Sequence, residues 1–323
     1  MARAFMRHHF SATAWRIVHS LGGLAVILLV AAAAGCRREK DSPPEAPPLA
    51  LEHMSTILTN GWASGSEARL AFAGTTMYVP LGAAGMDVYA IGDLAHPVLL
   101  CRVGIDTLGG QRGAVAAAGG RAFVAALSTE GDSVVELDMS APEYPSVLCR
   151  FNGIPEYDQL VLRDNQLYIQ SGSCVDYDGG VYVFAATQSP PLLVGKYLAN
   201  LIDPGFYVTA VGRVFQARTP EFAEDFPSID VVDMADPAAP KVLSTWRSHK
   251  QLNVCDIDVR LGRAYCAGYW GGVLVLRGAD TERLELEAEY DWSGGSKAAA
   301  SSAAAPPYIF VARGDSAGGA GNF

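Results

Sequence analysis

The chain has 323 residues, half of them hydrophobic, and a formal net charge of −10 at pH 7. A chain of this length and composition can bury a large core as one big domain or two ordinary ones, so disorder is excluded as its main state. The negative charge would repel a phosphate backbone, and we therefore expect no nucleic-acid partner.

The first 35 residues are typical of a secretory signal. Three arginines precede the apolar stretch 21–34, which ends in small residues before Cys36. This stretch is too short, and too quickly followed by charge, for a membrane span. We therefore predict a signal peptide over residues 1–35.

The end of this segment, Ala33-Ala34-Gly35-Cys36, resembles a bacterial lipobox, in which the cysteine is diacylated and becomes the mature N-terminus. Ala33 stands where leucine is usual, and an ordinary signal peptide with an incidental cysteine is the alternative. Residues 36–50 continue as a proline-rich spacer that favours extended conformations. The resemblance implies lipidation at Cys36, and Arg37 in place of aspartate implies the outer membrane.

A short apolar segment with an aromatic residue recurs six times from about residue 68 onward. Glycine-rich or Asp-Asn turns precede most copies and are of the kind that closes hairpins. β-branched and aromatic residues dominate, without a sustained helical period. The aromatic residues, spaced by 45, 45, 47, 50 and 45 positions, are Tyr78, Phe123, Tyr168, Phe215, Tyr265 and Phe310.

Each repeat unit contains four short strands, with a proline-containing turn between the third and the fourth. This content is typical of a β-propeller blade, because radial stacking covers both apolar faces of every sheet. A pair of β-sandwiches or a β-helix is the alternative, although a sandwich lacks a uniform period and a β-helix has a shorter one. We predict an all-β propeller of about six four-stranded blades over residues 51–323.

The turn between the third and fourth strands carries a family resemblance. The segments VVDMADPAAP (231–240) and VVELDMSAPEYP (134–145) resemble the LVIVD repeat of bacterial and archaeal cell-surface propellers. The resemblance covers about residues 68–292 and implies a surface protein without an assigned reaction. Asp138 and Asp233 are interpreted as residues that form Asx turns.

The last repeat is partial, because residues 308–323 contain one strand followed by a Gly/Ala-rich stretch. We expect either that the last blade is incomplete, as in a truncated chain, or that the N-terminal strand around residues 53–59 completes it and closes the ring.

No catalytic or metal-binding pattern stands out in the sequence. The histidines after the signal are isolated, and a nucleophile elbow and a phosphate-binding loop are absent. The segment 176–179, DYDG, resembles part of a calcium loop but lacks the downstream acid, so a solvated turn is the favoured interpretation. We predict no catalytic residues, no metal and no cofactor; a calcium-stabilised adhesin is a further alternative.

Two features are candidates for a special role. Cys255 and Cys266 flank one hairpin turn and are a candidate disulfide in an oxidising compartment. The acidic insertion 219–227 is a candidate binding loop or an ordinary packed surface loop. Its candidate binding residues are Glu221, Phe222, Glu224, Asp225 and Phe226.

These features together predict an exported, lipid-anchored, monomeric propeller without catalytic activity. We expect it to bind or scaffold an unknown protein or polysaccharide at the cell envelope. The alternative is a propeller hydrolase or lyase that acts on envelope polysaccharide. Such an enzyme would need acids from several blades to converge. The candidate acids are Asp87, Asp176, Asp178 and Asp258.

Overall fold

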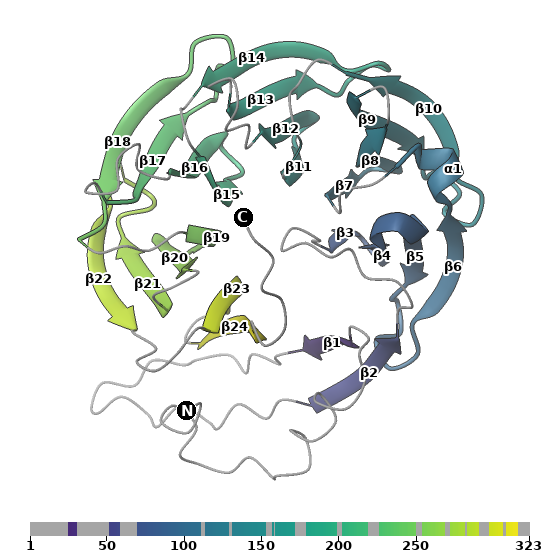
Figure 1. The fold of residues 1–323 in the computed structure, drawn as a ribbon, viewed down its shortest axis with the longest axis horizontal. Helices are drawn as coiled ribbons and strands as arrows, with labels where there is room; N and C mark the ends of the chain where they lie inside the picture. Colours follow the sequence, from purple (N-terminus) through teal and green to yellow (C-terminus); the bar gives the residue numbers. More distant parts are fainter. Residues whose placement is uncertain are drawn as a thin grey trace, which may run out of the picture.

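The structure, a computed structural model, is an all-β fold in which five four-stranded antiparallel sheets surround a common centre (Figure 1). It describes residues 25–30, 52–58, 70–110, 114–128, 131–152, 157, 159–171, 179–198, 202–218, 226–249, 254–268, 272–281, 283–290, 297–305 and 308–315. Within these ranges, no helix has both the length and the apolar content needed to cross a membrane.

Every four-stranded sheet is a meander of consecutive strands. Sheet 1 consists of β3 (Ala71–Ala73), β4 (Thr76–Pro80), β5 (Met86–Ala90) and β6 (Val98–Val103). Sheet 2 consists of β7 (Val115–Ala118), β8 (Arg121–Ser128), β9 (Gly131–Asp138) and β10 (Ser146–Phe151). Sheet 3 consists of β11 (Gln159–Arg163), β12 (Gln166–Ser171), β13 (Gly180–Ala185) and β14 (Leu192–Leu198).

The remaining two large sheets follow the same plan. Sheet 4 consists of β15 (Ile202–Val208), β16 (Arg213–Arg218), β17 (Ser228–Asp233) and β18 (Lys241–Arg247). Sheet 5 consists of β19 (Val254–Arg260), β20 (Arg263–Gly268), β21 (Gly272–Arg277) and β22 (Glu285–Tyr290). Two short helices, η1 (Gly82–Ala84) and α1 (Ile105–Leu108), lie within sheet 1 and between sheets 1 and 2.

The sheets are arranged radially, as in a propeller. The first strand of each sheet lies near the centre and the fourth lies at the perimeter (Figure 1). Neighbouring sheets contact each other through their first strands, β3 with β7, β7 with β11, β11 with β15 and β15 with β19. This radial arrangement of antiparallel sheets confirms the prediction of an all-β, propeller-like fold.

The predicted number of about six four-stranded blades is wrong, because the described residues form five such sheets. After sheet 5, β23 (Lys297–Ala305) and β24 (Tyr308–Asp315) form a two-stranded sheet, and β23 contacts β19. Residues 297–315 are enough for one hairpin but not for a meander of four strands. The N-terminal strand β2 (Glu52–Leu58) does not join this hairpin, since it pairs with β1 (Ala25–Val30). Strand β1 falls within the predicted signal peptide.

Among the described residues the core consists of five apolar clusters, of which four each join two consecutive sheets and the fifth lies within sheet 1. Strand β8 illustrates the pattern: Phe123 and Ala125 face sheet 3, whereas Ala122 and Val124 face sheet 1, and all four are buried. Because both faces of an inner strand are covered, its sequence shows no polar side. This double burial explains why the apolar segments are continuous and why the sheets stack radially.

The predicted turns are largely confirmed. The hairpin between β11 and β12 turns at Asp164 and Asn165, which have φ values of 47° and 60°. At the turns after β17 and β9, the Oδ1 atom of Asp233 accepts the N–H of Ala235 at 3.0 Å and that of Asp138 accepts the N–H of Ser140 at 2.9 Å. These two aspartates therefore shape turns, as the sequence indicated.

Of the two cysteines in the predicted disulfide, Cys266 is a free thiol in the structure, and the side chain of Cys255 lies outside the described residues. The antiparallel register pairs Cys266 with Ile257, and it is irregular between Val254 and Asp256. Burial raises the pKa of the Cys266 thiol well above its usual range, which keeps the thiol neutral.

Sheets 3 and 4 approach each other closely at Gly195 of β14. A Cβ atom at this position would lie 1.7 Å from the carbonyl oxygen of Pro237 and 2.9 Å from the amide nitrogen of Ala238. Both are backbone atoms of the turn after β17, so the turn itself must shift to make room. We expect Gly195→Ala to lower the free energy of unfolding by about 1–3 kcal/mol.

The control for this substitution is Gly92→Ala, because a Cβ atom at Gly92 would meet nothing within 4 Å. Urea denaturation followed by circular dichroism measures both variants. Equal stability of the two variants would contradict the close approach of the sheets.

The buried carboxylate of Asp87 on β5 links two strands of sheet 1. Its oxygens accept Nε and Nη2 of Arg102 at 2.6 and 2.9 Å, and the hydroxyl of Tyr89 at 3.2 Å. Burial, and then the nearby negative charge of Asp87, raise the pKa of Tyr89 to about 12. The unfolded chain releases this proton near pH 10, whereas the folded protein retains it to higher pH.

We expect the free energy of unfolding to fall as the pH rises from about 10 to about 12, because the unfolded state then binds fewer protons than the native state. Tyr89→Phe should make this fall less steep, whereas below pH 9 its pH dependence should match that of the wild type. Urea denaturation at a series of pH values measures the slope. An unchanged slope in Tyr89→Phe would show that Tyr89 titrates normally.

Candidate functional site

A pocket of about 470 Å³ lies between the outermost strand of sheet 4 and the segment that enters β22 of sheet 5. Its volume falls within the range of roughly 300–1,000 Å³ that is usual for small-molecule sites. The pocket lies at the rim of the molecule, where β18 and β22 form the perimeter (Figure 1). Its lining residues are Leu243, Ser244, Thr245, Trp246, Arg247, Arg283 and Leu284.

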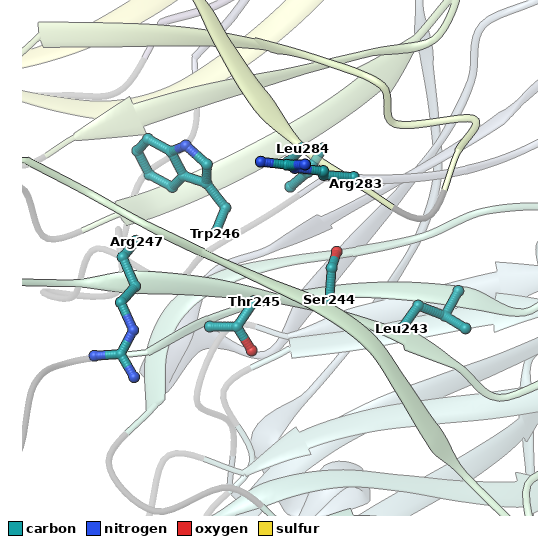
Figure 2. A pocket seen from close by; sticks show the side chains of 7 residues that line it. All are labelled: Leu243, Ser244, Thr245, Trp246, Arg247, Arg283 and Leu284. Atoms are coloured by element: carbon teal, nitrogen blue, oxygen red, sulfur yellow. The ribbon is translucent and has the colours of Figure 1, made fainter.

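Strand alternation decides which side chains of β18 share a face. Ser244 pairs with Val231 and Trp246 pairs with Ile229, two buried residues of the core between sheets 4 and 5. Figure 2 shows Ser244 and Trp246 pointing toward Arg283 and Leu284, whereas Thr245 and Arg247 point to the opposite side of the strand. Ser244 and Trp246 therefore lie on the side of β18 that faces Arg283 and Leu284.

The hydroxyl group of Ser244 is buried, and among the described residues it has no hydrogen-bond partner. Leaving a buried hydroxyl without a partner costs about 1–3 kcal/mol, so such a group in a pocket wall needs an explanation. Trp246 next to it is half-buried and packs one part of its ring against the apolar cluster between the sheets. A polar group and a flat apolar surface therefore lie side by side.

A tight turn after β21 holds Arg283 in place. Gly278 has a φ of 86°, and the hydroxyl of Thr281 donates to its carbonyl at 2.8 Å and accepts the N–H of Arg283 at 3.2 Å. From sheet 4, Nη1 of Arg213 donates to the carbonyls of Ala279 and Thr281 at 3.2 and 3.0 Å. The backbone that carries Arg283 is thus fixed by both of the sheets that form the pocket.

The charge of Arg283 is only weakly compensated. Its side chain is 83% exposed, and its Nε lies 3.9 Å from Oε1 of Glu285. Glu285 is already bound by Nη2 of Arg277 at 2.7 Å, and this hydrogen bond lowers the pKa of Glu285. Two guanidinium groups therefore share one carboxylate, and the pocket has a positive wall.

Most of the residues that the sequence singled out lie outside the described part of the structure. This holds for Cys36 and for the loop residues Glu221, Phe222, Glu224 and Asp225. Phe226, at the end of the insertion, is 43% exposed. The insertion ends beside the pocket strand, because Ser228 pairs with Arg247 and the carbonyl of Pro227 accepts the N–H of Ser248 at 2.8 Å.

Of the acids considered for a hydrolase, the two that the structure describes, Asp87 and Asp258, lie on different sheets. Asp87 lies on sheet 1 in its pair with Arg102, and Asp258 lies on sheet 5 with an oxygen 3.6 Å from Nε of Arg260. Asp176 and Asp178 fall outside the described residues. In the part of the chain that is described, no three histidine, cysteine or acidic side chains form a group suited to a metal ion.

Sequence reasoning missed the pocket residues Ser244, Trp246 and Arg283. Trp246 lies in the fourth strand of one repeat, and Arg283 belongs to the next repeat. The alternation of β18 indicates that Ser244 and Trp246 share a face. Their meeting with Arg283 follows only from the radial stacking of the sheets.

No family model and no curated protein matches this chain. Among solved structures, it is similar to a protein of Thermus thermophilus named as a putative oxidoreductase (glucose dehydrogenase), with a TM-score of 0.51 and 14% identity over 76% of this chain and 90% of that chain. It is also similar to the computationally designed protein Ika8, with a TM-score of 0.50 and 15% identity over 76% of this chain and 67% of that one. At such low identities the likeness shows the propeller-like fold alone.

Proposed function

We propose that this protein is a non-catalytic lipoprotein, built on a β-propeller, that binds or scaffolds a partner at the cell envelope. The observation that carries the binding role is the pocket between sheets 4 and 5, where Ser244, Trp246 and Arg283 meet. The exposed guanidinium of Arg283 and the half-buried ring of Trp246 are groups that a ligand in this pocket can contact. The lipobox-like sequence at Cys36 supports the anchor, and the resemblance to LVIVD repeats supports a surface location.

The anchor is tested by comparing the wild-type protein with Cys36→Ala in cells. We expect the wild-type protein to sediment with outer membranes and its processing to stop in the presence of globomycin, because lipidation precedes cleavage in this class of proteins. The variant should be absent from the membrane fraction, whereas Cys101→Ala should behave as the wild type. Unchanged processing and membrane retention of Cys36→Ala would refute the lipid anchor.

The binding role is tested without the lipid, so that membrane insertion does not contribute. Purified Cys36→Ala protein is mixed with washed envelopes from cells that lack the protein, and the bound fraction is measured after sedimentation. We expect saturable binding, and we expect it to decrease when Arg283→Gln is added but not when Arg163→Gln is added, because Arg163 is an exposed arginine of β11 that does not line the pocket. Binding that does not saturate, or that both added substitutions leave unchanged, would contradict a specific role for the pocket.

A further inference from the structure

We propose that one flat face of the propeller-like disc rests on a lipid bilayer. This inference rests on the lipid anchor of the proposed function and gives the anchored protein an orientation. In each four-stranded sheet the strands are consecutive and antiparallel, so the turn between strands one and two and the turn between strands three and four lie at the same end. The sheets surround a common centre (Figure 1), and each fourth strand leads to the next first strand, so all five sheets place these turns on one side of the disc. We call this side the turn face.

A ring of exposed aliphatic side chains recurs on the turn face. In every four-stranded sheet the fourth strand begins after the turn and soon carries an irregularity in its register. The last paired residue before this irregularity is leucine or valine in all five sheets, and its exposed fraction lies between 39% and 48%. These residues are Leu99, Val147, Leu193, Val242 and Leu286. Equivalent positions of a radial repeat lie on a circle and therefore in one plane, which matches a flat apolar partner.

Leu261, in a turn near the centre of the same face, is not explained by the needs of the fold. Its φ of 50° is left-handed, a conformation that favours glycine and asparagine over leucine. Sheets 2 and 3 have Gly119 and Asp164 at this place in the hairpin turn. The leucine side chain is 79% exposed, so its burial does not offset the strain. A strained and exposed leucine points to a contact outside the chain, because such strain is concentrated at functional positions.

The charges of the turn face select the kind of partner. The turns between strands three and four carry an exposed acid in four of the five sheets, namely Asp93, Glu143, Asp236 and Asp280. Among the described residues of these turns, Arg283 is the one lysine or arginine. Two copies stacked through this face would bring like charges together, and a polyanion would be repelled. A bilayer of zwitterionic lipids instead presents ammonium groups to the acids and apolar chains to the aliphatic ring.

The anchor keeps this contact close to its partner. Fifteen residues separate Cys36 from Glu52, the first residue of β2. A spacer of this length reaches about 50 Å when it is extended as polyproline. A disc held within this distance meets the bilayer at a high effective concentration, so a modest apolar contact is enough to orient it. Without the anchor we expect the same contact to be weak but measurable.

The test uses the mature chain with Cys36→Ala, so that lipid insertion does not contribute, and protein-free phosphatidylcholine vesicles. Co-sedimentation measures the bound fraction. We expect binding that falls when anionic phosphatidylglycerol is added, because the protein carries a net negative charge. Leu99→Ser combined with Leu193→Ser should weaken binding by about 10-fold or more. The matched control is Ile105→Ser combined with Leu198→Ser, two exposed aliphatic residues at the opposite end of the sheets, and it should change binding less than about 2-fold.

Leu261→Asn separates a role at the bilayer from a role in folding. Asparagine adopts the left-handed conformation more readily than leucine, so this variant should melt at the same temperature as the wild type or higher. It should nevertheless bind neutral vesicles about 3-fold more weakly, because an exposed apolar side chain is lost. Thermal melting and co-sedimentation measure the two effects on the same sample.

The outcomes distinguish the turn face from the anchor. Absence of binding to neutral vesicles, tighter binding with anionic lipid, or an equal loss in the control variant would each overturn the bilayer contact. A dimer in gel filtration that Leu99→Ser with Leu193→Ser abolishes would assign the turn face to a second copy instead. If neutral vesicles bind through the turn face but the cellular protein is not lipidated at Cys36, the anchor fails and the contact stands. If the protein is lipidated but neutral vesicles do not bind, the contact fails and the anchor stands.

Discussion

Replacing Arg121 by methionine lowers the free energy of unfolding by about 3–5 kcal/mol, because it leaves a buried carboxylate without its partner. Nε of Arg121 donates to Oε1 of Glu136 at 2.7 Å, and Glu136 has no exposed surface. The same guanidinium donates to the carbonyls of Ala186 and Gln188, which belong to sheet 3. The substitution therefore removes one ion pair and two links between sheets 2 and 3.

The repeat supplies a matched control for this prediction. Arg263 occupies the same place in sheet 5, as the first strand residue after the hairpin turn, but it pairs with Glu287 at the surface and is 44% exposed. Arg263→Met should cost much less stability, since exposed ion pairs contribute little. Urea denaturation measures the stability of both variants. Similar losses of stability would mean that Arg121→Met does not leave the Glu136 carboxylate uncompensated.

A double substitution separates the pair from the packing around it. Because a buried ion pair can be replaced by apolar groups at little cost, Arg121→Met combined with Glu136→Leu should recover most of the stability lost in Arg121→Met alone. The links to the carbonyls of sheet 3 are absent in both variants, so their contribution cancels. Failure of the double variant to recover would place the main loss in the links between the sheets.

The repeat interval predicted the sheets well because each unit must bury two apolar faces in the same way. The aromatic residues Phe123, Tyr168 and Phe215 all lie in the second strand of a four-stranded sheet and are fully or almost fully buried. Each is preceded by a hairpin turn whose backbone suits glycine or asparagine. The burial of the aromatic residue and the hairpin turn before it depend only on residues of one repeat. A single sequence is therefore enough to predict them.

The partners of the buried acids were not predictable in this way. Asp87, Glu136 and Asp230 lie in third strands, where a reader of the sequence expects apolar residues. Each is paired with an arginine 12 to 15 positions away, from a neighbouring strand of its own sheet. The register of that strand decides the pairing, as for Asp87 and Arg102, which lie directly opposite each other on β5 and β6.

The pocket depends on two repeats at once, which is a further reason why sequence reasoning missed it. Arg213 is the first residue of β16, and from there it binds the turn that carries Arg283. The arginines at 121, 213 and 263 share one position in the repeat but differ in their partners. Arg121 binds an acid of its own sheet and carbonyls of the next one, Arg213 binds carbonyls of the next sheet, and Arg263 binds an acid of its own sheet.

We expect Asp230→Ala to destabilise the protein by about 2–4 kcal/mol, because one buried carboxylate serves three donors. The oxygens of Asp230 accept the hydroxyls of Tyr197 and Thr245, each at 2.6 Å, and lie 3.3 Å from Nη1 of Arg218. Tyr197 belongs to β14 of sheet 3, so this cluster also joins two sheets. Burial, and then the bond to Asp230, raise the pKa of Tyr197 above its usual range.

The control is Asp233→Ala, three residues along the same strand. Asp233 is exposed and accepts only the N–H of Ala235 among the bonds described here, so its loss should cost much less. In a double-mutant cycle by urea denaturation, Tyr197→Phe should destabilise the wild type but have little effect in Asp230→Ala, because the hydroxyl has already lost its acceptor. An equal effect in both backgrounds would show that the Tyr197 hydroxyl contributes independently of Asp230. It would also mean that the hydrogen bond between these two residues does not hold sheets 3 and 4 together, and that their contact depends on other packing, such as the close approach at Gly195.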